Sequence, residues 1–430
     1  MPSISRVNAY VASTTQCANR EVPFSAFTIT DDSNCKGDDS EDLKLAATMN
    51  ALAIAEDEAT RRVGRETKTA NPIISDADYK CERLCYHAWL QPPARAYRTE
   101  EDVSTMLSSH SVMDIAHTRL PLFVPPKRPI SFTPSPKESA PESNPDLISG
   151  LCAFLHDKVR RINASSATTD VMDKLLKCLS LVAAFTPRHP LRLVLMTTSQ
   201  PSEPWKVYAR FVAGTLFVER GDVSNSFTGT KGTEFEERVK EKRDHRLHHR
   251  VYSVVSAQLA HLNVVLTAEA DAVDERGNVV EIRTRPAWVR EDNRSFQNWM
   301  QCRLAGVGTV AMGKFTADRG NPQVSFHPTN VEVLSLDQYA ERNHLTCTPS
   351  ARALAFKVYH RFISWLRVVC EAAPGQVFEI RYNPSARSVT ASPDDKFPFP
   401  IDEKVVRAAL HAVLRHFKAP ASASKDTTEK

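Results

Sequence analysis

Pairs of charged residues two positions apart occur twice in a short stretch of this sequence, and they are its strongest chemical signal. Glu269 and Asp271 lie in an apolar run that predicts a strand, and Glu281 and Arg283 lie in the next such run. Residues two apart on a strand point to the same face. The intervening segment 274–278 contains a Gly-Asn pair that suits a hairpin turn. We therefore expect three carboxylates and one cation to share a patch at a sheet edge.

Glu236 would reach the same patch from one turn inside a predicted helix, and the carboxylates then allow two interpretations. Acidic side chains that repel one another are tolerated around a divalent cation, and Mg²⁺ takes oxygen ligands while keeping some waters. Two such ions can activate a water and stabilise the leaving oxygen in phosphodiester cleavage. Alternatively, these residues are solvated charges at a strand edge and form cross-strand ion pairs. The spacing alone favours this second interpretation, because such pairs are common on exposed strands.

A basic stretch follows Glu236 and is the second chemical feature. Its cations are Arg238, Lys240, Lys242, Arg243, Arg246 and Arg250. The pattern predicts one long helix over 232–262, so these side chains would form a helix face. Such a face either contacts RNA phosphates along the path of a bound strand or is simply solvated, which is the commoner case.

Two possible zinc motifs are weak. His245 and His249 stand four apart, and Cys81 and Cys85 are followed by His87. Neither set has a second ligand pair at the spacing of a zinc site. The sequence also contains no phosphate-binding loop, no dinucleotide fingerprint and no nucleophile elbow. Buried thiols are therefore the better explanation for the cysteines.

The composition is that of a globular protein. Of 430 residues, 42% are hydrophobic and 25% are charged, and the net charge is +4. These values exclude a wholly disordered chain, a collagen and a coiled-coil rod. Only 13 residues are Gly, which argues against a fold built on Gly-rich phosphate loops. The length allows two to three domains, or one large α+β domain with an extension.

Cysteine usage and hydropathy suggest the compartment. Nine cysteines are irregularly spaced, and the segment after Met1 carries no hydrophobic leader. No apolar run approaches the ~18 residues that a membrane helix needs. We therefore expect free thiols in the reducing environment of the nucleus or cytoplasm, and no membrane partner.

The chain changes character near residue 145. Residues 1–145 form a divergent region with expected helices at 41–65 and 78–90 and a Pro-rich run at 120–129, which predicts a linker or an extended arm. The dense, regular part at 146–418 is expected to be the main domain, and 419–430 a disordered tail. The divergent region is expected to be partly disordered as well.

Helices and strands alternate in this main domain. Helices are expected at 147–159, 171–185, 232–262, 293–304, 350–371 and 403–417. Strands are expected at 191–198, 205–219, 264–273, 279–284, 309–315, 331–336 and 377–382. This alternation predicts an α+β fold with mixed β-sheets flanked by helices.

Several segments arrive in an order that resembles the DXO family of decapping exoribonucleases. They are a Trp205–Glu219 strand, Gly232-Thr-Glu-Phe-Glu236, Glu269-Ala-Asp271, Glu281-Ile-Arg283 and a Trp299-Met-Gln301 helix. The family carries Gly-x-x-x-Glu, Glu-x-Asp, Glu-x-Lys and Trp-x-Gln motifs in this order. No single motif is specific, but four in order are. The resemblance spans roughly 191–315 and implies a PD-(D/E)xK-nuclease-like core.

The resemblance also implies roles for individual residues. The metal ligands would be Glu236, Glu269, Asp271, Glu281 and the Ile282 carbonyl, around one or two Mg²⁺ (or Mn²⁺) ions. Glu269, Asp271 and Arg283 would be catalytic. The substrate would contact Arg188, Glu236, Arg283 and Gln301, with Arg192 as the alternative to Arg188.

One residue departs from the family pattern, because Arg283 stands where the family has Lys. An arginine keeps the charge and can bind phosphate with two hydrogen bonds, but it does not release a proton near neutral pH. The resemblance implies a metal-dependent hydrolase of RNA 5′ ends, with removal of incomplete or non-standard caps such as NAD, pyrophosphate release and 5′–3′ degradation. A 5′–3′ exoribonuclease is a candidate partner. The alternative is a weakened homologue that binds and shields RNA 5′ ends without cutting them.

Overall fold

The computed structural model describes most of the chain after residue 78. The described residues are 79–89, 99–107, 111–113, 115–134, 147–162, 168–198, 202–221, 230–245, 251–289, 293–317 and 323–418. The helix expected at 41–65 and the tail expected at 419–430 lie outside this part of the chain.

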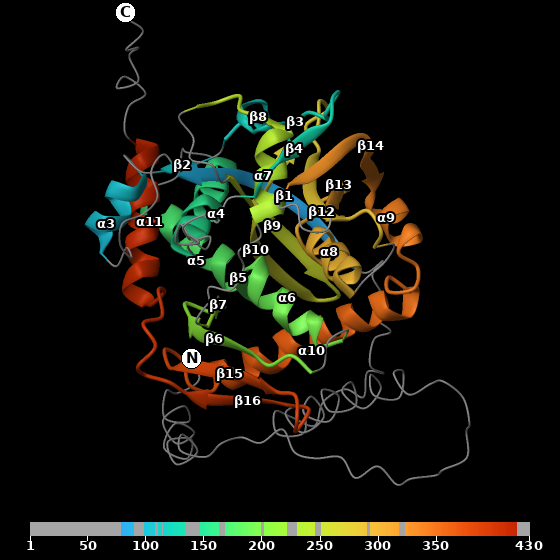
Figure 1. Cartoon of the computed structure of the whole chain (residues 1–430). Coiled ribbons are helices and arrows are strands. Elements are labelled where there is room, and N and C mark those ends of the chain that lie inside the picture. Colours follow the sequence, from blue (N-terminus) through green and yellow to red (C-terminus); the bar gives the residue numbers. More distant parts are fainter. Residues whose placement is uncertain are drawn as a thin grey trace, which may run out of the picture.

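The larger sheet has nine strands in the order β16-β15-β6-β7-β5-β10-β9-β1-β2 (Figure 1). They are β1 (Tyr79–Trp89), β2 (Ser111–Met113), β5 (Ala184–Pro187), β6 (Trp205–Val212), β7 (Thr215–Arg220), β9 (Val251–Leu259), β10 (Leu262–Ala270), β15 (Val377–Asn383) and β16 (Ser388–Pro393). β5 runs parallel to β7 and β10. Val264 and Leu266 of β10 pack into one core while Val265 packs into another, so β10 is buried on both faces.

The smaller sheet has seven strands in the order β4-β14-β13-β12-β11-β3-β8. They are β3 (Leu122–Phe123), β4 (Ile130–Phe132), β8 (Lys240–Glu241), β11 (Ala272–Val273), β12 (Val279–Pro286), β13 (Thr309–Ala317) and β14 (Val324–Ser335). β10 ends at Ala270 and β11 begins at Ala272. The chain therefore passes from one sheet to the other through Asp271.

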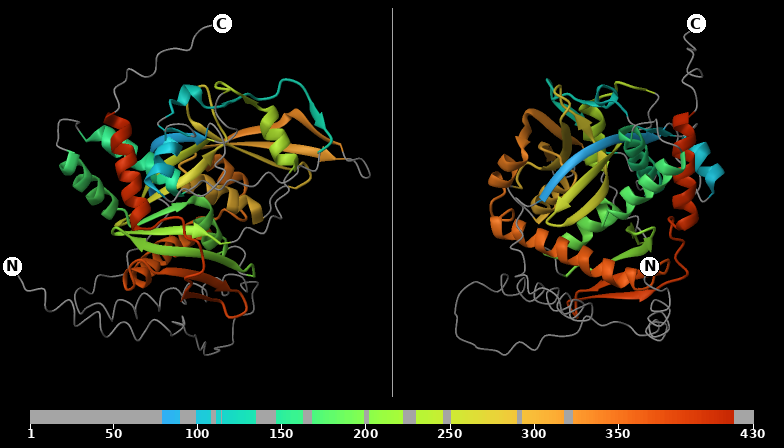
Figure 2. Two further views of the ribbon diagram at one scale, coloured as in Figure 1. Left: turned by 90° about the vertical axis from the view of Figure 1, so that its left-hand side faces the viewer. Right: turned by 180° about the vertical axis from the view of Figure 1, so that it is seen from behind.

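Helices cover both faces of the larger sheet (Figure 2). They are α4 (Leu147–Arg161), α5 (Thr168–Ser180) and α11 (Glu403–Lys418) on one side, and α6 (Arg188–Met196), α8 (Asn293–Leu304) and α10 (Pro349–Glu371) on the other. α7 (Thr230–Arg238) packs on the smaller sheet, while α3 (Glu100–Thr105), α9 (Leu336–Arg342) and a short 3₁₀ turn η4 (His117–Arg119) lie at the periphery. This arrangement confirms the α+β class with mixed sheets flanked by helices.

The long helix predicted over 232–262 is wrong. α7 ends at Arg238, and β8 and β9 follow it. β9 is buried on both faces, so its apolar run does not alternate with polar residues and cannot be distinguished from a buried helix by period alone. The basic helix face predicted between Glu237 and Arg250 therefore does not exist as such. His249 lies outside the described residues.

Four other element predictions differ from the structure. The segment expected as a helix at 78–90 is β1, and the strand expected at 191–198 belongs to α6. The helix expected at 171–185 ends at Ser180, so that β5 can enter the sheet. The strand expected at 205–219 is the hairpin β6–β7, because Ala213 and Gly214 both have positive φ and turn the chain.

Strand pairing crosses the boundary that we placed near residue 145. β1 pairs with β9 over its length, and β4 pairs with β14. Part of the Pro-rich run forms β3, which pairs with β8 and β11. The extended arm is thus built into the smaller sheet rather than lying outside the main domain. Among the described helices, none is both long and apolar enough to cross a membrane.

Candidate active site

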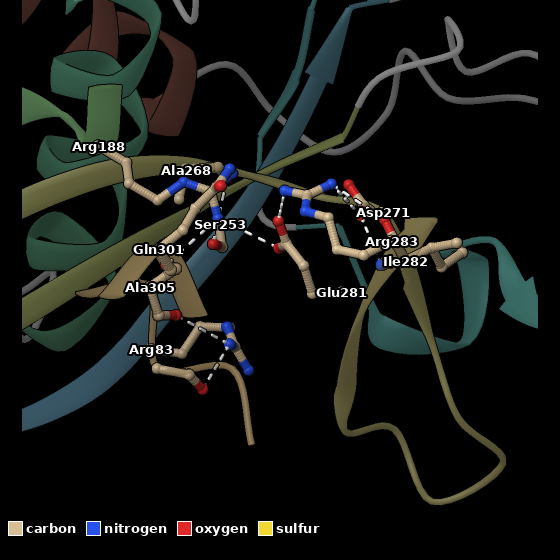
Figure 3. Close-up of polar contacts among 11 residues, drawn as sticks. Arg83, Arg188, Ser253, Ala268, Asp271, Glu281, Ile282, Arg283, Gln301 and Ala305 are labelled. Atoms are coloured by element: carbon tan, nitrogen blue, oxygen red, sulfur yellow. Dashed lines mark hydrogen bonds and ion pairs between the residues drawn. The ribbon is translucent and has the colours of Figure 1, made fainter. Parts of the chain in front are cut away.

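Two of the predicted carboxylates, Asp271 and Glu281, lie close to the same guanidinium, that of Arg283, where the two sheets meet (Figure 3). Asp271 sits at the crossing between β10 and β11, and its Oδ2 accepts a hydrogen bond of 2.8 Å from the Ile282 backbone N–H of β12. Asp271 and Glu281 are only 6% and 0% exposed. The interpretation of these residues as solvated strand-edge charges is therefore wrong, because both are buried.

Glu281 is held by two arginines from different elements. Its Oε2 lies 3.2 Å from Arg188 Nη1 at the start of α6, and its Oε1 contacts Arg283 Nη2 on the same strand. Burial opposes ionisation of Glu281, but Arg188 and Arg283 together hold its pKa below the ordinary value. Glu281 is therefore an ionised group that joins α6 to β12.

Arg283 contacts three of the five predicted metal ligands. Its guanidinium touches Glu281, donates to the Ile282 carbonyl at 3.0 Å and lies 3.7 Å from Asp271 Oδ2. The arginine side chain folds back over its own strand to make these contacts (Figure 3). Compared with the lysine of the family motif, the guanidinium of Arg283 is larger and planar. It places positive charge among Glu281, Asp271 and the Ile282 carbonyl, which the family resemblance assigns as metal ligands.

Glu236 is positioned by the packing of α7 on the smaller sheet. Its neighbour Phe235 is fully buried and stacks on Phe326 with ring centroids 4.3 Å apart. A Cβ at Gly313 would lie 2.6 Å from the Phe235 ring, so the missing side chain lets α7 approach β13. Burial raises the pKa of Glu236, Lys240 lowers it, and Glu269 raises it further. Glu236 and Glu269 are thus close enough to interact.

Lys240 was predicted on a basic helix face, and the structure places it beside Glu236 instead. Its Nζ lies 2.6 Å from Glu236 Oε1 and 3.3 Å from Glu237 Oε1, and its side chain is 7% exposed. Burial opposes its charge, but Glu236, Glu237 and Asp271 raise its pKa above the ordinary value. The predicted long helix would have continued through this lysine. Instead β8 brings it back over the smaller sheet, beside the carboxylates.

Glu236, Glu269, Asp271 and Glu281 form what we call the acidic cluster. Burial, together with Glu281 and Glu236, raises the pKa of Asp271 to about 8. A raised carboxyl pKa indicates negative charge that the surrounding cations only partly offset. The cluster therefore has the electrostatic property expected of a cation site.

The donor chemistry of the acidic cluster fits a hard divalent cation, because it supplies carboxylate oxygens. The side chains are not arranged as a finished cage. Within the described segments, no group of three His, Cys, Asp or Glu side chains is placed to hold an ion. Arg283 provides a physical reason, since it occupies Glu281 and the Ile282 carbonyl. The same finding leaves the weak zinc motifs without support in this part of the chain.

A basic cluster lies on the other side of Glu281. It comprises Arg188, His189, Arg192 and Arg220. Burial and the neighbouring arginines lower the pKa of His189 to about 2. Burial, Arg188, Arg283 and Arg220 lower the pKa of Arg192 to about 10, against the favourable effect of Glu281. The cations repel one another, so this side of the site favours an anion.

The local structure of α6 adds to this preference. The helix begins at Arg188 after Pro187, and no side chain caps its first turn. The free N–H groups and the helix dipole make such a helix start favourable for anions. The buried Nε of Arg192 has no hydrogen-bond partner. His189 and Arg220 were not recognised from the sequence, because Arg220 lies at the end of β7, far from α6 along the chain.

Gln301 lies beside Arg188, but the contact is through its backbone. Arg188 Nη1 is 3.5 Å from the Gln301 carbonyl oxygen on α8. The structure thus brings together Arg188, Glu281, Arg283 and Gln301 (Figure 3). Asp271, the next member of the acidic cluster, lies near the Arg283 guanidinium. Arg192 lies in the same basic cluster, so both arginines considered for the substrate end are at the site.

Mixed sheets flanked by helices, with buried acidic residues where the sheets meet, define a PD-(D/E)XK nuclease fold. Residues 227–404 match the model of RAI1-like PD-(D/E)XK nucleases. The matched part contains every predicted site residue except Arg188 and its alternative Arg192. The resemblance inferred from the motif order is confirmed. No curated protein matches the sequence significantly.

Solved structures share the fold. The chain is similar to Candida albicans Rai1 in complex with pU5-Mn²⁺, with 15% identity and a TM-score of 0.54, over 81% of this chain and 100% of that one. It is also similar to S. pombe Rai1, with 14% identity and a TM-score of 0.51, over 74% and 98% of the two chains. A further S. pombe Rai1 structure, in complex with 3′-FADP, has 14% identity and a TM-score of 0.50, over 74% and 98%.

Proposed function

We propose that this protein is a divalent-metal-dependent hydrolase that acts on RNA 5′ ends. The observation that carries the proposal is the meeting of two opposite clusters at one buried residue, Glu281. The acidic cluster favours a cation, and the basic cluster favours an anion. A terminal phosphate with its metal ion satisfies both. The similar Candida albicans protein was solved with pU5-Mn²⁺, a ligand that combines these two elements.

Specific residues would perform each part of this reaction. Glu236, Glu269, Asp271, Glu281 and the Ile282 carbonyl would hold Mg²⁺ or Mn²⁺. One or two bound ions would supply a Lewis acid and an activated water. Arg188 and Arg192 would bind the 5′ phosphate, and Arg283 would donate to the scissile phosphate. Gln301 would help Arg283 to position the phosphate.

The substrates we propose share a phosphate close to the 5′ end. They include RNA with incomplete or non-standard caps such as NAD, RNA with a 5′-triphosphate, and 5′-monophosphate RNA degraded in the 5′–3′ direction. In each, the reacting phosphorus would lie between the two clusters. The S. pombe protein was solved with 3′-FADP, a nucleotide ligand, which supports a pocket for nucleotide-like groups in this fold.

The contacts of Arg283 favour a second candidate function. A guanidinium that neutralises Glu281 and Asp271 and engages the Ile282 carbonyl takes over part of the role of an ion. The protein would then bind and shield RNA 5′ ends without cutting them. The lysine of the family motif would leave the carbonyl free, because its single ammonium has a shorter reach.

A cleavage assay separates the two functions. Purified protein is incubated with Mg²⁺ or Mn²⁺ and with 5′-monophosphate, 5′-triphosphate, unmethylated-cap or NAD-capped RNA. We expect metal-dependent cleavage that is lost in the Glu269→Gln, Asp271→Asn double variant. Arg283→Lys is the matched variant. No cleavage by the native protein, with cleavage gained by Arg283→Lys, would favour the end-binding function.

We further propose that the protein acts in the nucleus or cytoplasm, with a 5′–3′ exoribonuclease as a candidate partner that degrades the processed RNA. The thiols support a reducing compartment, because none of the cysteines in the described residues forms a disulfide. Co-purification with and without RNase treatment would test the partner, since a direct complex survives the loss of RNA.

A further inference from the structure

One edge of β12 is open beside the acidic cluster. β12 pairs with β13 from Val280 to Pro286, but with β11 only at Val279 and Val280. From Glu281 onward, the opposite edge has no strand partner among the described residues. This edge starts at the carboxylates and leads away from them toward the end of the strand. Arg283 and Arg285 lie along it, with no acidic residue as far as Val289.

Trp288 stands at the far end of this edge. It is 66% exposed, the largest exposed aromatic side chain in the described residues. The backbone beneath it is fixed, because Ala287 N–H donates to the Phe315 carbonyl at 2.8 Å and Val289 N–H donates to the Pro286 carbonyl at 3.1 Å. Most of the Trp288 ring is exposed to water, and the turn beneath it is ordered. The ring is therefore suited to pack against an external partner.

A cation lies beside the same surface. Lys231, at the start of α7, places Nζ 5.2 Å from the centroid of the Phe315 ring. Trp288 meets Phe315 edge to face, with centroids 6.4 Å apart. Trp288 and the exposed Lys231 thus both contact the buried Phe315 ring of β13, and together they form one patch, which we call the Trp288 platform. Trp288 follows β12, the strand of Glu281, and Lys231 is on α7, the helix of Glu236.

We propose that the Trp288 platform stacks a base of the single-stranded RNA that leaves the candidate active site in the 3′ direction. Aromatic side chains beside basic residues are the common means of holding single strands without sequence preference. The open edge of β12 gives the strand a route, and the exposed Lys231 matches the charge of the backbone. This inference rests on the proposed function, because it takes the 5′ end to lie at the acidic cluster.

Binding of two RNA lengths tests the proposal. The probes are a 5′-phosphorylated dinucleotide and a 5′-phosphorylated oligonucleotide of about ten residues, a length that a single-strand groove covers. Affinity is measured by fluorescence anisotropy with the full chain in EDTA, which prevents metal-dependent cleavage. The variants are Trp288→Ala, Trp288→Phe and, as the control for loss of an exposed apolar side chain, Leu181→Ala, which is 67% exposed at the opposite end of β5 from Arg188.

We expect Trp288→Ala to weaken binding of the longer oligonucleotide about 5- to 100-fold, the range of one base–aromatic stack. The dinucleotide should bind all variants equally, Trp288→Phe should retain most of the affinity, and Leu181→Ala should match the native protein. Binding of both probes with no effect of Trp288→Ala would overturn the platform alone. Binding of neither probe to the native protein would overturn the proposed function and the platform together.

Discussion

The two sides of the candidate site carry opposite charge and are compensated in different ways. The acidic cluster faces two cations, Lys240 and Arg283, both buried against it. The basic cluster shares one buried carboxylate, Glu281, which Arg188 reaches directly. As a result, the pKa of Asp271 rises to about 8, while the pKa of Arg192 falls to about 10.

This difference shows that neither side is electrostatically complete within the fold. Each shift moves a group toward its neutral form, which is the response first to burial and then to neighbours of like charge. A ligand with a cation at one end and an anion at the other would relieve both. The following predictions test whether the two sides are distinct, in order of decreasing expected effect.

Replacing Arg188 should have the largest effect. Arg188→Met leaves the fully buried Glu281 with one cation fewer, and breaking a buried pair costs about 3–5 kcal/mol of unfolding free energy. Arg192→Met is the matched control, and it should cost clearly less because Arg192 is opposed by three other arginines. Urea unfolding measures both, and the thermal shift caused by inorganic phosphate should shrink in both. If Arg188→Met and Arg192→Met lower the free energy of unfolding equally, the predicted difference between the two arginines is wrong, because Arg192 would then be as well paired as Arg188.

The acidic side should respond to pH in the opposite sense from a normal carboxylate. Asp271 has a pKa of about 8 in the folded protein against 3.8 as a free group, so the folded state holds the proton more tightly. Its contribution to stability is therefore present at low pH and is lost as pH rises from about 4 to about 8. One such group changes the free energy of unfolding by at most about 1.4 kcal/mol per pH unit.

Asp271→Asn removes this dependence while keeping an acceptor for the Ile282 N–H. In EDTA, we expect the variant to gain about 1–3 kcal/mol relative to the native protein on going from pH 5 to pH 8. Unfolding in urea at the two pH values is the measurement. A difference between variant and native that does not change with pH would show that Asp271 is already ionised across this range.

Lys240→Met should have the smallest effect and sharpens the comparison. Lys240 is buried, but Glu236 and Glu237 are 21% and 36% exposed and can be solvated when the lysine is lost. We expect a loss of about 1–2 kcal/mol, less than for a fully buried pair. The control Arg238→Met breaks an exposed pair with Glu234 and should cost about 0.5 kcal/mol or less. If Lys240→Met loses no more unfolding free energy than Arg238→Met, Lys240 does not offset the charge of the acidic cluster.

The order of motifs along the chain indicated the family resemblance, and it singled out several residues that the structure brings together. Glu269, Asp271 and Glu281 could be located because strands β10 and β12 show clear patterns, and residues two apart share a face. The helix with Gln301 was also predicted within its observed bounds. The roles assigned to these residues stay predictions until cleavage is measured.

The errors have a common physical cause. β1 and β9 are interior strands of the larger sheet, so their patterns do not alternate in the simple way of a half-buried strand. The place of Lys240 beside Glu236 was missed for the same reason, because a helix extended through β8 would have pointed it elsewhere. Arg220 was missed because β7 meets β5, the strand that leads into α6, through a sheet pairing that is remote in sequence.

The sequence by itself determined which residue types could hold phosphate or metal, their order and the strands that carry two of the carboxylates. These follow from local spacing, which acts over a few residues. Only the tertiary structure decided that the carboxylates are buried rather than solvated, that Arg283 folds onto three predicted ligands, and that Lys240 and the basic cluster join the site. These features depend on which sheets meet at Asp271, and burial and charge interaction act through space rather than along the chain.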